Sequence, residues 1–180
     1  MLYVDAIAQV VVAAPHGNDV GVWALDSTLS SQTPSATIPG LAGARAVAVA
    51  ADSSGKDFAV VAEIGCNPQR IALAVGTLQG FSHVTTVASG GNNAQIQPTV
   101  AWVPASSQAP SDSWVVSWIF VDGASTHALA MRFDASGNPV GGVIDPQLNA
   151  IGAIATSGGA VMGYVPSQGK MVSASLGCAF

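Results

Sequence analysis

Few side chains in this sequence are of the types that carry out chemistry. Of the three histidines, His16 and His127 stand beside short polar connections, residues 15–18 and 122–126, that follow apolar segments. A catalytic or metal site would need both to converge with a carboxylate, whereas loops at equivalent places of repeated units lie on different units. We therefore expect exposed loop histidines, and keep His16 and His127 only as candidate ligand-binding residues.

The four tryptophans divide into two pairs. Trp114 and Trp118 are four residues apart, which places them on one face of a strand, and we expect them to pack between sheets. Trp23 and Trp102 have no such partner. Because sugar-binding proteins use exposed aromatic rings as platforms, Trp23 and Trp102 are the candidate ligand-binding tryptophans.

The patterns of catalytic and metal sites are missing from the sequence. There is no Gly-x-Ser-x-Gly motif, and the single glutamate, Glu63, leaves no neighbouring pair of carboxylates for glycoside hydrolysis. Segments 52–57 and 134–138 resemble calcium loops, but neither has glycine at its sixth position, so we expect turns. The sequence predicts a non-enzymatic protein with no metal and no cofactor.

The two cysteines, Cys66 and Cys178, are a candidate disulfide, since paired cysteines are typical of exported proteins. They fall in the second and fourth repeats described below. A disulfide requires Cα atoms within about 7 Å of each other. Repeats that are not neighbours would not bring the two cysteines that close. The pairing is left open.

Composition excludes several classes of protein. The chain has 180 residues, of which 49% are hydrophobic and only 8% are charged, against about 25% charged in an ordinary domain. Disordered chains and coiled coils are much more highly charged. The net charge is −5 and the five basic residues are scattered, so we expect no nucleic-acid partner. The longest apolar segment is about half a membrane span, so we expect no membrane insertion.

The sequence contains a repeat of about fifty residues. Four pairs of apolar segments are each separated by a short connection rich in Gly, Asn and Pro, which is typical of β-hairpins. A small residue, Ala24, Ala74, Ala130 or Ala174, can be matched in the second segment of each pair. We place one domain over residues 1–180, with repeats of approximately 1–43, 44–94, 95–147 and 148–180.

Further apolar segments flank the hairpins and give about four short strands per repeat, which is the period of a β-propeller blade. Consecutive apolar residues in these segments indicate sheets buried on both faces. We therefore predict an all-β, propeller-like array of four-stranded antiparallel blades. Repeat one has no clear first strand and repeat four ends at its third, so about three and a half blades are expected.

An array with incomplete end blades has open edges, which invite pairing. Three explanations stay open. The chain is part of a longer propeller, or copies of it complete a ring by donating strands to one another, or it closes on itself as a small four-bladed ring.

The third repeat carries a recognisable pattern. Trp114-Val-Val-Ser-Trp118, Asp122-Gly123 and the segment Arg132-Phe-Asp-Ala-Ser-Gly-Asn-Pro-Val-Gly141 resemble the secreted propeller-like repeats of large myxobacterial surface proteins. The resemblance covers residues 114–144. It implies export and a surface or extracellular role, and it brings no catalytic residues.

The expected function is therefore that of an extracellular or cell-surface scaffold, which assembles with copies of itself, or with partner segments, through open blade edges. The alternative is a glycan-binding lectin module that uses polar loop residues and an exposed tryptophan. The first residues, Met1 to Asp5, do not read as a signal peptide, so we expect that the leader is not present in this chain.

Overall fold

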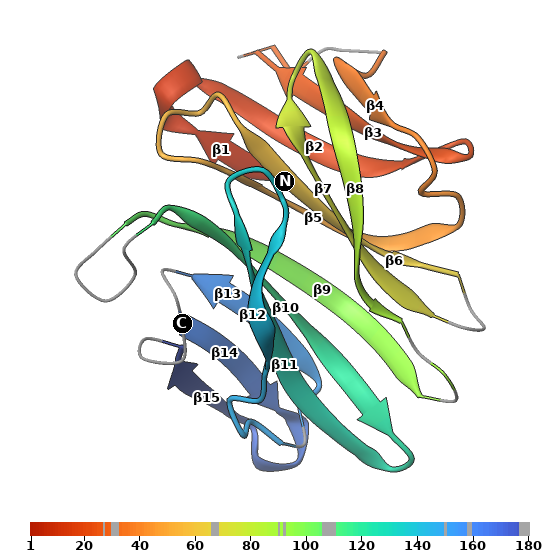
Figure 1. Cartoon of the computed structure of the whole chain (residues 1–180), viewed down its shortest axis with the longest axis vertical. Coiled ribbons are helices and arrows are strands. Elements are labelled where there is room, and N and C mark those ends of the chain that lie inside the picture. Colours follow the sequence, from red (N-terminus) through yellow and green to blue (C-terminus); the bar gives the residue numbers. More distant parts are fainter. Residues whose placement is uncertain are drawn as a thin grey trace.

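The computed structural model describes residues 1–26, 28–29, 33–65, 69–89, 91, 93–105, 111–149, 151–157 and 160–176. Its strands form four antiparallel sheets, each built from strands that follow one another along the chain (Figure 1). The first sheet contains β1 (Leu2–Val4), β2 (Gln9–His16), β3 (Asp19–Leu25) and β4 (Ala36–Ile38), with a short 3-10 helix, η1 (Asp5–Ile7), after β1.

The second sheet contains β5 (Ala44–Ala51), β6 (Phe58–Ile64), β7 (Arg70–Thr77) and β8 (Gly80–Ser89). The third contains β9 (Ala94–Val103), β10 (Ser113–Asp122), β11 (Ser125–Asp134) and β12 (Pro139–Ile144). The fourth contains β13 (Ala153–Ser157), β14 (Ala160–Val165) and β15 (Lys170–Ser175), with the 3-10 helix η2 (Pro166–Gln168) between the last two.

The predicted all-β, propeller-like array of antiparallel sheets is confirmed, and so are the four hairpins, which are β2–β3, β6–β7, β10–β11 and β14–β15. The strand count of repeat one was wrong. Residues 2–4 form β1, paired with β2, so among the described residues three sheets have four strands and the last has three. This strand was missed because an apolar run follows it directly in the sequence. In the structure η1, from Asp5 to Ile7, separates the strand from β2.

The core lies between consecutive sheets and consists of three separate hydrophobic clusters. In β6, Phe58, Val60 and Ala62 face the first sheet, whereas Ala59 and Val61 face the third. Every residue of β6 is buried. This explains why apolar residues occupy consecutive positions in a strand: both faces of an inner sheet are covered.

The predicted packing role of the paired tryptophans is confirmed. Trp114 and Trp118 of β10 are fully buried in the cluster between the second and third sheets, together with Phe133 of β11. The indole nitrogen of Trp118 donates a hydrogen bond to Oε1 of the buried Gln95 at 2.5 Å. Burying this polar group is therefore compensated.

A buried carboxylate joins the second and third sheets. Glu63 of β6 is 7% exposed. Its Oε2 accepts a hydrogen bond from the backbone N–H of Gln97 at 3.1 Å, and its Oε1 accepts one from the Gln69 side chain at 3.1 Å. The pairing of β9 with β10 is irregular next to Gln97, which has a φ of 50°. The bulge turns this N–H away from the ladder and toward Glu63.

No helix in the described part of the chain is long and apolar enough to cross a membrane.

Candidate functional site

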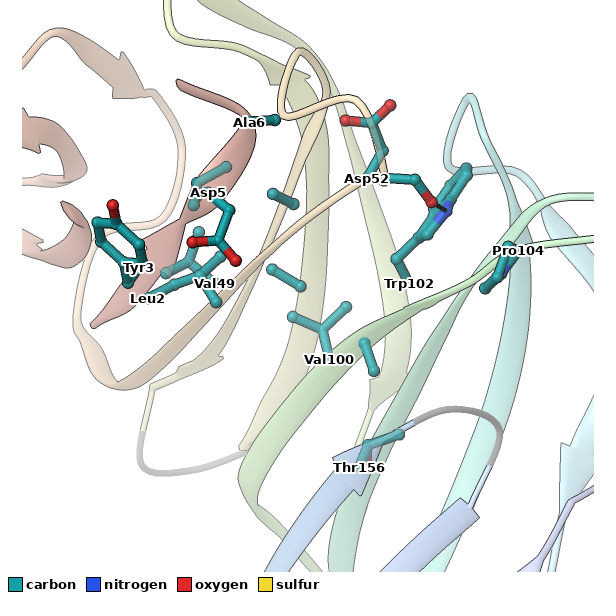
Figure 2. Close-up of a pocket in the computed structure, with 15 residues that line it drawn as sticks. Leu2, Tyr3, Asp5, Ala6, Val49, Asp52, Val100, Trp102, Pro104 and Thr156 are labelled. Atoms are coloured by element: carbon teal, nitrogen blue, oxygen red, sulfur yellow. Dashed lines mark hydrogen bonds between the residues drawn. The ribbon is translucent and has the colours of Figure 1, made fainter. Parts of the chain in front are cut away.

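The first strands of the four sheets line a common groove with a volume of about 530 Å³ (Figure 2). Its walls are residues 2–6 of β1 and η1, residues 49–53 of β5 and the turn after it, residues 100–102 and 104 of β9 and the segment after it, and Thr156 of β13. We call this the axial groove. Most of its lining residues are small or aliphatic, and its polar side chains belong to Tyr3, Asp5, Asp52, Ser53, Trp102 and Thr156.

Trp102 lies in the wall of the axial groove, opposite Asp5 (Figure 2). Its indole nitrogen donates a hydrogen bond to Oγ of Ser53 at 3.0 Å. Its ring packs edge-on against Trp114, with centroids 4.5 Å apart and planes at 61°. Trp102 is half-buried, so part of this predicted platform is already covered by the protein's own core.

Asp52, at the rim of the groove, belongs to a closed turn. Its Oδ1 accepts the backbone N–H of Lys56 at 2.9 Å and its Oδ2 accepts the hydroxyl of Ser54 at 2.6 Å. Partial burial raises the pKa of Asp52, but the hydrogen bonds from Ser54, Asp57 and Lys56 outweigh it, and the pKa lies below its usual value. The carboxylate is ionised and engaged in its own loop.

The segment that begins at Asp134 closes in the same way. Oδ1 of Asp134 accepts the N–H groups of Ser136 and Asn138, both at 2.9 Å. The prediction of turns at 52–57 and 134–138 is confirmed. No group of three or more His, Cys, Asp or Glu side chains among the described residues is arranged to hold a metal ion.

The outer face of the first sheet carries apolar side chains that no other sheet covers in the described part of the chain. Strand register places on this face, which we call the leading face, Tyr3, Val10, Val12, Ala14, Trp23 and Leu25. Tyr3 is 59% exposed. Trp23 lies over Gly21, where an added Cβ would be 2.4 Å from the ring, and the His16 ring is 5.7 Å from it.

The outer face of the last sheet is apolar as well. Register places on it Ala155, Met162, Tyr164, Met171 and Ser173, which we call the trailing face. Tyr164 is 40% exposed and Met171 is 63% exposed. Figure 1 shows the two end sheets at opposite ends of the array.

The structure separates the residues that the sequence singled out. Trp102 lines the axial groove, Trp23 and His16 lie on the first sheet, and His127 lies at the start of β11. His127 Nδ1 is hydrogen-bonded to Oδ1 of Asn149 at 2.5 Å, which ties β11 to the segment before the last sheet. They therefore form no single site. The expectation that both histidines are exposed loop residues was wrong, because His16 is the last residue of β2 and His127 lies within β11 and is half-buried. Cys66 and Cys178 lie outside the described residues.

Tyr3, Tyr164 and Met171 were not predicted as functional residues. The apolar segments that contain them resemble all the others in the chain. Only their place on the first and last sheets leaves them uncovered, and no local pattern reports which sheets are the end ones.

No protein-family model matches this chain, and a search of curated proteins found no match.

Proposed function

We propose that this chain is a non-enzymatic scaffold domain of an exported or cell-surface protein, and that it assembles with further copies of itself through the open ends of its sheet array. The observation that carries the proposal is the pair of apolar outer faces. The inner sheets are packed against their neighbours in three clusters, apart from exposed outer strands such as β12, whereas Tyr3 on the leading face and Met171 on the trailing face are more than half exposed.

Physical considerations favour covering these faces. Burying one large apolar side chain stabilises an assembly by about 1.5–3 kcal/mol, and contiguous exposed apolar patches on soluble proteins usually mark interaction surfaces. The low content of charged residues, 8%, means that little charge has to be desolvated when two such faces meet.

The last sheet adds an outer strand. Among the described residues it has three strands where the others have four, and β15 lies at its edge. An edge strand can offer backbone N–H and C=O groups to a strand of another copy. This supports assembly through strand pairing as well as through the sheet faces.

Location outside the cell is part of the proposal. It is supported by a surface that is rich in Ser, Thr, Asn and Gln but poor in Lys and Glu, and by the resemblance of residues 114–144 to secreted propeller-like repeats.

Light scattering on the purified chain over a concentration series tests the assembly. We expect a mass above that of one chain, 17.9 kDa, which falls on dilution. The double variant Tyr3→Glu, Met171→Glu places a charge on each outer face and is expected to stay monomeric. A wild-type chain that is monomeric at every concentration would overturn the proposal.

The axial groove supports a second candidate, which is glycan binding with Trp102 as the aromatic contact. Its support is the half-buried indole in the wall of a groove of about 530 Å³. Titration with neutral oligosaccharides, followed by tryptophan fluorescence, tests it. A response that is lost in Trp102→Ala and retained in Trp23→Ala would support this candidate, and no response to a broad oligosaccharide panel would contradict it.

A further inference from the structure

The second interface inside the chain shows one way in which two consecutive sheets fit together. Each inner sheet has one face directed toward the preceding sheet and one toward the following sheet. At the second interface, the third sheet contributes the bulky Trp114, Trp118 and Phe133, and the second sheet receives them on small and aliphatic residues such as Ala59 and Val61. The interface is complementary because bulk on one side meets small residues on the other.

The leading face is the preceding-side face of the first sheet. In β3, Val20 and Val22 face the second sheet, where they belong to the first hydrophobic cluster, so their neighbours Gly21 and Trp23 face outward. Like the corresponding face of the third sheet, this one carries a tryptophan, and Tyr3 adds a second aromatic ring. It is a bulky face that no sheet built from the described residues covers.

The trailing face is the following-side face of the last sheet. In β14, Val161 and Val165 point back into the cluster shared with the third sheet. Met162 and Tyr164 therefore point outward, and Ala155, Ser173 and Met171 lie beside them. Apart from Tyr164, the face consists of small residues and flexible methionines, which can adapt to a bulky partner.

We propose that the leading face of one copy packs on the trailing face of a second copy, head to tail, and so continues the interfaces that already join the four sheets within the chain. This inference rests on the proposed assembly and specifies its geometry. The occupant is a second copy because the chain itself supplies both halves of the contact, a preceding-side face and a following-side face.

Head-to-tail contact has a structural consequence. Two copies joined at both ends would place eight sheets around one axis, and natural propellers have about four to eight blades. The first strands of both copies would then surround the axial groove. A contact between two identical faces, leading on leading or trailing on trailing, would leave the other two faces uncovered.

Two single variants distinguish these geometries. Tyr3→Glu alters the leading face, at a residue that also lines the axial groove, and Met171→Glu alters the trailing face. Both positions are more than half exposed, so neither change should unfold the chain, as circular dichroism will verify. Val143→Glu on β12, where Val143 is 53% exposed, is the matched control because it lies on neither end face.

In a head-to-tail assembly, each single variant alone breaks every contact in the ring, since each copy contributes one altered face. We expect the dissociation constant to rise at least about tenfold for both variants, and to be unchanged for Val143→Glu. An equimolar mixture of Tyr3→Glu and Met171→Glu retains one intact contact, leading face of the second on trailing face of the first. Native mass spectrometry with one variant isotope-labelled should therefore show mixed dimers in excess over same-variant dimers.

Other outcomes overturn the inference. If only one single variant dissociates and the other stays assembled, the contact joins identical faces. If neither single variant changes the mass of an assembled wild type, other surfaces such as the β15 edge carry the contact, and the proposed function stands while the head-to-tail geometry falls. A monomeric wild type would overturn both.

Discussion

Replacing Glu63 tests whether one buried carboxylate holds the second sheet to the third. The substitution Glu63→Gln keeps the size of the side chain and removes its charge. Gln97 N–H and the Gln69 amide each donate to a different oxygen of Glu63, both at 3.1 Å. Glutamine has one oxygen, so in the variant one of these donors loses its acceptor unless the Gln69 amide turns to accept from the new NH₂ group; in either case both bonds lose their charged partner.

The magnitude follows from the lost bond. A hydrogen bond to a charged group stabilises a protein by about 1.5–3 kcal/mol. The neutral amide is cheaper to bury than the carboxylate, which offsets part of the loss. We expect the free energy of unfolding to fall by about 2 kcal/mol, which corresponds to a drop in Tm of roughly 4–8 °C for a chain of this size.

Urea unfolding followed by tryptophan fluorescence is the appropriate assay, since Trp114 and Trp118 are buried in the same sheet–sheet interface. A companion variant is Gln69→Ala, which removes the half-buried donor alone and leaves Glu63 bonded to the Gln97 N–H; it should lower stability by about 1.5 kcal/mol, the lower end of the same range. A Glu63→Gln variant within about 0.5 kcal/mol of the wild type would refute the argument, because the carboxylate would then not be joining the sheets.

Three further predictions concern the core, the turns and the leading face. Phe133→Ala is expected to lower the free energy of unfolding by about 3–5 kcal/mol, because Phe133 is fully buried beside Trp114; Val143→Ala, at an exposed position, should change it by less than about 0.5 kcal/mol in the same urea titration. Burial raises the pKa of Asp134, but hydrogen bonds from Asn138, Ser136 and Gly137 lower it below its usual value. The ionised form of Asp134 therefore stabilises the fold above about pH 4, which is near the pKa of the unfolded chain. This contribution is lost as the pH falls through the lower pKa of the folded state. The stability difference between wild type and Asp134→Asn should therefore shrink on acidification, and a difference independent of pH would contradict this. Gly21→Ala would place a Cβ 2.4 Å from the Trp23 ring, so the ring should move off the sheet, and ¹⁹F NMR of fluorotryptophan-labelled protein should show one shifted resonance; four unchanged resonances would show that Trp23 does not lie over Gly21.

The strands were predictable from the sequence because the burial of each strand is reflected in the residue types of its own segment. The four predicted hairpins are present as β2–β3, β6–β7, β10–β11 and β14–β15. Runs of small and β-branched residues bounded by Gly, Asn and Pro need no distant information to be recognised as strands. The turns at Asp52 and Asp134 were predictable for the same reason, since each carboxylate bonds to backbone N–H groups a few residues away.

Which face of a strand meets which sheet was not predictable. Ala24, Ala74, Ala130 and Ala174 match in the sequence repeat, yet Ala74 and Ala174 face the preceding sheet whereas Ala130 faces the following one. A shift of one residue reverses the faces of a strand, and when both faces are apolar the sequence gives no sign of it. The bulge at Gln97 and its bond to Glu63 were hidden for a related reason, because the two residues are 34 positions apart.

The sequence alone determined that this protein is an array of short antiparallel strands, since hydrophobic period, turn chemistry and low charge are properties of neighbouring residues. The order in which sheets stack, and hence which apolar faces remain open, was decided only by the tertiary structure. Tyr3 and Met171 have the same local surroundings as buried residues elsewhere in the chain. They are exposed because, among the described residues, no sheet precedes the first sheet and none follows the last. Packing between sheets is a long-range contact, and no single segment of the sequence encodes it.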